Sequence, residues 1–132
     1  MAAPAARSQS PLVVVVDDDN AARHGLARVL GQAGFSVVQA SDGAQAVALL
    51  TTLWVRVGVV ISAVKMPRMS GKELARIVAE RWPSVAVLLV SGHGGDAIDD
   101  SPVPFLPKPC TREALVEAVR ALIRRPAAVA PD

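Results

Sequence analysis

Residues 12–19 read LVVVVDDD, an apolar run that ends abruptly in three aspartates. A continuous run of β-branched residues is typical of a strand that is buried on both faces, as strands are in the middle of a parallel sheet. Charge begins where the apolar run ends. We therefore expect a central strand over Leu12–Val16, with Asp17 and Asp18 at its carboxyl end.

Helical and extended patterns alternate along the rest of the chain. Apolar residues recur at helical spacing after Asn20, and Gly34 is placed to end that helix. Further strands are expected at residues 35–39, 57–62, 85–90 and 104–106. Further helices are expected over residues 44–50, from the capping box of Ser70 and Glu73 to Trp82, and after the capping residue Thr111.

This alternation predicts an α/β fold, in which helices cover both faces of a five-stranded parallel sheet through right-handed crossovers. We expect the flavodoxin-like strand order 2-1-3-4-5. The segment 92–104 contains three glycines and two prolines. The helix between the last two strands, the fourth in such a fold, is therefore predicted to be short or absent.

Length and composition limit the kind of protein. The chain has 132 residues, 52% of them hydrophobic and 20% charged, which suits a single domain. Residues 1–10 are interpreted as a disordered N-terminal tail and residues 125–132 as a tail or linker stub. The net charge of +2 comes from scattered basic residues, which argues against direct nucleic-acid binding.

The same data indicate a cellular setting. The single Cys110 cannot form an internal disulfide, so a reduced, cytoplasmic environment is the expected one. No apolar segment reaches the roughly 18 to 20 residues needed to span a bilayer. Residues 1–9 lack the apolar core of a secretion signal. We expect no membrane contact.

Polar side chains follow three of the predicted strands. Asp17 and Asp18 follow the first, Ser91 the fourth and Lys108 the fifth. Because the carboxyl ends of parallel strands meet at one edge, these residues are expected in one crevice. Adjacent carboxylates suit Mg²⁺, and a hydroxyl with an ammonium suits a phosphoryl group. The alternative is that the aspartates form a solvated turn that favours the start of a helix.

Four short motifs stand in the order and spacing of a known family. They are residues 13–18, the Met66-Pro67 turn leading to Gly71, Ser91-Gly92 and Lys108-Pro109. Over residues 12–123 the chain resembles the receiver domains of response regulators in two-component phosphorelay signalling, including the chemotaxis regulators. The resemblance implies a receiver domain over residues 11–124 that acts as a signalling module and not as an enzyme.

The resemblance also implies roles for individual residues. Asp18 would be a direct Mg²⁺ ligand, Asp17 a ligand through water, and Lys65 a ligand through its backbone carbonyl. Ser91 and Lys108 would bind the phosphoryl group. Ser91 would also act in the conformational switch with the aromatic residue Phe105, whose alternative role is that of a core side chain on an edge strand.

The chain departs from the family at the phosphate-accepting aspartate. The family pattern Asp-x-x-Met-Pro here begins with Ala63 and ends at Met66 and Pro67. The neighbouring Ser62 is a poor substitute because alternation along a strand points it to the other side of the sheet. The resemblance thus implies a receiver that cannot be phosphorylated and binds Mg²⁺ weakly or not at all. It is either a natural pseudo-receiver acting through protein contacts or the product of an engineered substitution.

Expected partners follow from the family. They are a sensor histidine kinase or phosphotransfer protein, an unknown downstream protein, and a second copy of the chain if the domain forms homodimers. The alternative function is a phosphohydrolase of the haloacid dehalogenase type, because residues 13–19 also fit the pattern hhhhDxD. That class needs an acidic pair after the lysine, where only Glu113 and Glu117 are present, and room for a cap domain.

Overall fold

The computed structural model describes residues 11–91, 103–107 and 110–124, which alternate between strands and helices. The strands are β1 (Leu12–Val16), β2 (Ser36–Ala40), β3 (Val57–Ala63), β4 (Ala86–Ser91) and β5 (Phe105–Pro107). The helices are α2 (Asn20–Gln32), α3 (Gly43–Leu53), α4 (Gly71–Arg81) and α5 (Arg112–Arg124), with a 3-10 turn, η1 (Trp54–Arg56), after α3.

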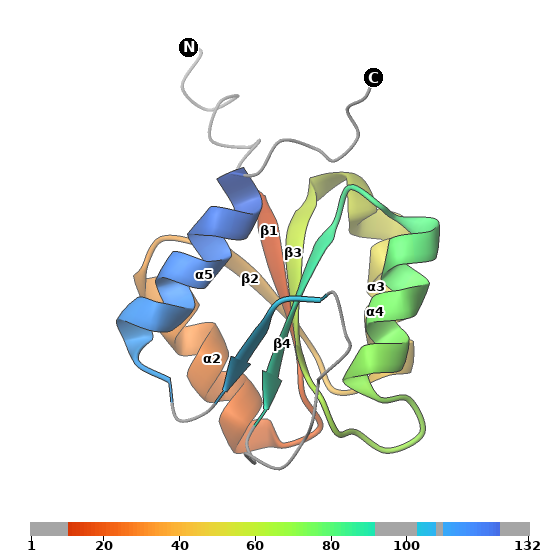
Figure 1. Cartoon of the computed structure of the whole chain (residues 1–132), viewed down its shortest axis with the longest axis horizontal. Helices are drawn as coiled ribbons and strands as arrows, with labels where there is room; N and C mark the ends of the chain where they lie inside the picture. Colours follow the sequence, from red (N-terminus) through yellow and green to blue (C-terminus); the bar gives the residue numbers. More distant parts are fainter. Residues whose placement is uncertain (1–10, 92–102, 108–109, 125–132) are drawn as a thin grey trace.

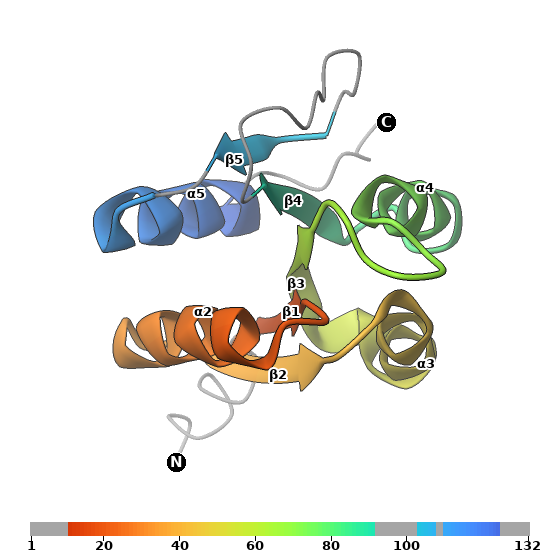
Figure 2. The same ribbon diagram turned by 90° about the horizontal axis from the view of Figure 1, so that it is seen from below.

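The five strands form one parallel sheet in the order β2-β1-β3-β4-β5 (Figure 1). Figure 2 shows α2 and α5 on one face of the sheet and α3 and α4 on the other. The predicted flavodoxin-like fold and its strand order are therefore confirmed. The arrowheads of β4 and β5 point downward in Figure 1, so Figure 2, seen from below, looks onto the carboxyl edge of the sheet.

Strand boundaries differ from the sequence prediction by one residue. β2, β4 and β5 each begin and end one residue later than expected, and β3 extends one residue further, to Ala63. Phe35 and Val85 belong to the preceding turns, because their N–H groups donate to Leu30 O at 3.1 Å and Trp82 O at 2.9 Å. The expected short fourth helix falls mainly on residues 92–102, which lie outside the described residues, as do both predicted tails.

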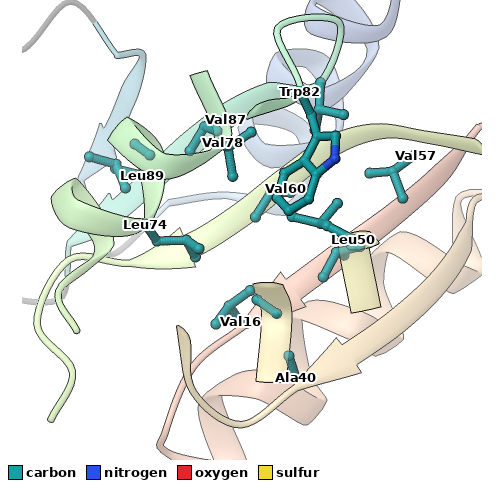
Figure 3. Packing of buried hydrophobic residues seen from close by; sticks show 14 of the residues in the cluster. Val16, Ala40, Leu50, Val57, Val60, Leu74, Val78, Trp82, Val87 and Leu89 are labelled. Atoms are coloured by element: carbon teal, nitrogen blue, oxygen red, sulfur yellow. The ribbon is translucent and has the colours of Figure 1, made fainter. Parts of the chain in front are cut away.

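The core consists of two apolar layers separated by the sheet. Val14 and Val16 of β1 pack into the layer under α3 and α4, whereas Val13 and Val15 pack into the layer under α2 and α5. All four valines are 0% exposed, as expected for a central strand covered on both faces. Figure 3 shows the first layer, in which side chains from both helices meet over the strands.

Side-chain caps begin all four described helices. The predicted caps are confirmed, since Ser70 Oγ accepts from Glu73 N at 3.1 Å and Thr111 Oγ1 accepts from Ala114 N at 2.9 Å. Asp19 caps α2, and Asp42 caps α3. In the part of the chain that the structure describes, no helix has both the length and the apolar character needed to cross a membrane.

Candidate functional site

The sheet register brings the ends of β1 and β3 together at the carboxyl edge. Val16 of β1 pairs with Ser62 of β3, and Ala63 pairs with Val90 of β4. Asp17 and Ala63, which follow the paired residues Val16 and Ser62, are therefore next to each other at neighbouring strand ends. This edge faces the viewer in Figure 2.

Asp17 is buried and held by its backbone and its side chain. It is only 5% exposed. Its N–H donates to Ala40 O at 3.2 Å, which extends the β1–β2 ladder by one bond. Its Oδ1 accepts from Asp19 N at 2.9 Å, and its carbonyl accepts from Arg23 Nη1 at 2.9 Å. Asp18, in contrast, is exposed, so the two carboxylates predicted to bind Mg²⁺ lie in different environments.

The backbone at the end of β3 is closely packed against the start of α4, although the side chain of Ala63 is only a methyl group. Gly71 lies so close to Ala63 that a Cβ at Gly71 would be 2.1 Å from Ala63 O. Gly71 N donates to Val64 O at 2.8 Å, which joins the two ends of the loop between β3 and α4. Ser62 is fully buried, and its Oγ donates to Ala63 O at 2.8 Å. The hydroxyl of Ser62 is thus already engaged, which fits its expected failure to replace the aspartate.

The remaining predicted site residues are only partly described. Lys65 is exposed in the loop after β3. Phe105 on the edge strand β5 is 36% exposed, so the alternative reading of Phe105 as a core side chain is wrong. Ser91 ends β4 and pairs with Pro107. The side chain of Ser91 and all of Lys108 lie outside the described residues, and the roles expected for these residues remain predictions.

In the described part of the chain, the carboxyl edge of the sheet offers few oxygen donors to a magnesium ion. Mg²⁺ binds through carboxylates and other oxygen ligands in octahedral geometry. Within the described ranges, no three histidine, cysteine, aspartate or glutamate side chains form a group that could hold a metal. The edge offers Asp17, whose Oδ1 is already engaged, and the exposed Asp18. These residues alone do not make up a complete metal site.

Two structural contributors were not anticipated from the sequence. Arg23 supports Asp17 from the first turns of α2, and Gly43 provides space for Met69 of the loop after β3. The position of Arg23, four residues after the capping Asp19, is a weak local signal for its contact with Asp17. The second joins segments that are far apart in the sequence, and no local pattern indicates it.

Comparisons with known proteins agree with this geometry. The family model described as the response regulator receiver domain matches residues 13–120. The sensor kinase CckA of Brucella abortus is 32% identical over 123 residues, which cover 89% of this chain and 13% of that protein. The transcriptional regulatory protein DctD of Rhizobium meliloti, for C4-dicarboxylate transport, is 34% identical over 118 residues, or 86% of this chain and 25% of that protein.

Solved structures show the same architecture. A response regulator receiver domain protein from Clostridium thermocellum superposes with a TM-score of 0.78 at 27% sequence identity, covering 86% of this chain and 94% of that chain. The chain thus matches nearly the whole of a solved receiver domain. It spans only 13% and 25% of the two longer curated relatives, CckA and DctD.

Proposed function

This chain belongs to the response regulator receiver family, and from that premise we propose that it is a receiver module whose phosphate-accepting position is occupied by Ala63. Receiver domains are in general signalling modules and not enzymes. As a family they bind Mg²⁺ and interact with sensor histidine kinases. The proposal concerns what this particular chain can still do within that family.

The observation that carries the proposal is the place of Ala63. It ends β3 beside Asp17, at the edge where the carboxyl ends of the strands meet. Phosphoryl transfer to a receiver requires a nucleophilic oxygen at that point, and a carboxylate supplies it in the family. The methyl group of Ala63 has no lone pair with which to attack phosphohistidine. The chain is therefore proposed to receive no phosphoryl group from a kinase.

In the absence of that reaction, the folded surface itself would carry the signal. We propose that a sensor histidine kinase or phosphotransfer protein recognises the domain, and that a downstream protein responds to the same constitutive shape. Asp17, Asp18 and Lys65 would form what remains of the metal site, with Ser91 and Lys108 as the phosphoryl-binding groups and Phe105 as the switch residue. Support comes from the family match and from the strand register, which brings Asp17 next to Ala63.

The test is phosphate incorporation by Ala63→Asp, with Ala63→Asn as the isosteric control. In the presence of Mg²⁺ and a small acyl phosphate donor, we expect no incorporation by the unaltered chain or by Ala63→Asn. We expect Ala63→Asp to take up phosphate in a hydroxylamine-labile form. The reason is geometric, because a carboxylate at residue 63 would lie beside Asp17 without any movement of the strands.

Two outcomes would contradict parts of this proposal. A stoichiometric, hydroxylamine-labile phosphate on the unaltered chain would show that another carboxylate replaces residue 63. Failure of Ala63→Asp with unchanged thermal stability would show that the pocket has drifted, which favours a natural pseudo-receiver over a single engineered substitution. Neither the relatives nor the fold support the haloacid dehalogenase alternative.

A further inference from the structure

We infer that the corner between β2 and α3 positions both halves of the candidate site. This β2–α3 corner comprises residues 39–43, and it lies on neither of the strands whose ends carry Asp17 and Ala63. Gln39 supports the turn after β1, whereas Gly43 supports the loop between β3 and α4. One short segment thus holds two structures that come from different strands.

The first support passes through Arg23. Strand pairing ends with Val16 and Ala40, and Asp17 N still donates to Ala40 O at 3.2 Å. After Ala40 the chain leaves the sheet and leads into α3. Beyond this last bond of the β1–β2 ladder, the carbonyl of Asp17 accepts from Arg23 Nη1 at 2.9 Å. The Nε of the same guanidinium donates to Gln39 Oε1 at 3.0 Å.

This arrangement suits an arginine. A guanidinium is planar and holds its donors in a fixed fork geometry, whereas a lysine ammonium carries its three donors on a compact, rotatable group at the end of a flexible stem. Gln39 fixes one side of the fork, and the other side is thereby aimed at the carbonyl of Asp17. Arg23 and Gln39 are accordingly positioning residues for the turn that presents Asp17 and Asp18.

The second support is the close approach of Met69 to Gly43. A Cβ at Gly43 would lie 2.4 Å from Met69 Sδ and 3.0 Å from both Met69 Cβ and Cγ. Because the base of the methionine side chain is involved as well as its flexible end, a rotamer change alone would not make room. The neighbouring Asp42 caps α3 by accepting from Gln45 N at 2.8 Å, and its Oδ2 lies 3.5 Å from Arg68 Nη2.

The shape of the loop makes this support necessary. Arg68 has a φ of 70°, and Met69 N donates to Pro67 O at 2.7 Å, so the chain makes a tight turn at its tip. A left-handed backbone at a residue with a Cβ is costly. The loop is held at its neck by the bond from Gly71 N to Val64 O and at its tip by the β2–α3 corner. The backbone around Lys65, between these two points, depends on both.

The inference predicts that substitutions in the β2–α3 corner change the backbone geometry after β1 and after β3. The first test is Gly43→Ala in the full chain, followed by ¹H–¹⁵N amide shifts. We expect the largest shifts outside α3 at residues 64–70. Gly25→Ala on α2 is the matched control, because nothing lies within 4 Å of the added Cβ. Adding Met69→Ala to Gly43→Ala should return the amides of residues 64–66 toward their original positions.

The second test concerns the turn after β1. Arg23→Lys keeps the charge but loses the fork, and Gln39→Ala removes the outer acceptor. Both are expected to shift the amides of residues 17–19, whereas Arg28→Lys on the exposed side of the same helix should not. Gln39 is exposed, so Gln39→Ala will fold even if Gly43→Ala does not. Amide shifts confined to the substituted element in both tests would overturn the inference.

An activity measurement complements these tests and is the one part that rests on the proposed function. In the Ala63→Asp background, Arg23→Lys and Gly43→Ala should each lower the rate of phosphate incorporation by about tenfold, because misplaced groups lose catalytic geometry. The controls Arg28→Lys and Gly25→Ala should leave the rate unchanged. If Ala63→Asp takes up no phosphate, the proposed function fails while the amide shifts still decide this inference.

Discussion

The ends of β1 and β3 lie side by side at the carboxyl edge of the sheet, yet they differ in the side chains that they carry. The end of β1 retains its carboxylates, with Asp17 buried and bonded and Asp18 in solvent. The end of β3 has a methyl group at Ala63 but retains a closed backbone, with Gly71 packed against the carbonyl of that residue. The backbone geometry at a strand end and the chemical group presented there are thus determined by different residues.

The largest expected effect comes from opening the end of β3. In Gly71→Ala the new Cβ would lie 2.1 Å from Ala63 O, a backbone atom that cannot rotate away. We expect a loss of about 3 kcal/mol in the free energy of unfolding, measured by urea denaturation. Gly25→Ala, which meets no atom within 4 Å, should instead gain about 0.5 to 1 kcal/mol from helix propensity. Equal stability of the two variants would refute the close-packing argument.

The next largest effect concerns Mg²⁺ affinity and tests the chemical difference between the two strand ends. Ala63→Asp adds a carboxylate beside Asp17, and Mg²⁺ affinity depends on the charge and number of its ligands. We expect Ala63→Asp to bind Mg²⁺ at least about tenfold more tightly than the unaltered chain, measured by isothermal titration calorimetry. Ala63→Asn tests whether charge or only an added oxygen is needed. Equal affinity of the unaltered chain and Ala63→Asp would show that residue 63 does not face the metal site.

A smaller effect concerns what the two ends have in common. Each leads into a helix that begins with a side-chain cap, Asp19 for α2 and Ser70 for α4. Asp19→Ala and Ser70→Ala should each lower the free energy of unfolding by about 1 kcal/mol, because one backbone N–H loses its acceptor. Ser84→Ala, in an exposed turn, is the control and should change stability by less than about 0.5 kcal/mol.

The smallest effect tests the tip of the loop after β3. Arg68 has a φ of 70°, which glycine adopts without strain. Its side chain is 81% exposed, so its ion pair with Asp42 contributes little. Arg68→Gly should raise the free energy of unfolding by about 0.5 kcal/mol, since the relief of strain exceeds the added freedom of the unfolded chain. A clear loss of stability would show that the ion pair matters more than the backbone.

The sequence by itself determined the order of the elements and placed Asp17 at the carboxyl end of the central strand β1. Strand β1 was predicted without error because an unbroken β-branched run is a local signal of double-sided burial. The caps at Ser70 and Thr111 were predicted because a capping side chain acts within three residues. The absence of an acceptor aspartate was inferred from the family pattern Asp-x-x-Met-Pro, in which Ala63 stands at the first position, and it stays a prediction.

Only the tertiary structure decided how the strand ends are supported. The contacts of Arg23 with Gln39 and of Gly43 with Met69 join residues 16 and 26 positions apart. The exposure of Phe105 likewise depends on which elements cover the edge strand β5. Local periodicity carries no information on such pairs, because their proximity depends on how the sheet aligns segments that are distant in the sequence. Packing between distant segments therefore determines the geometry of the site, whereas its chemical character is visible in the sequence.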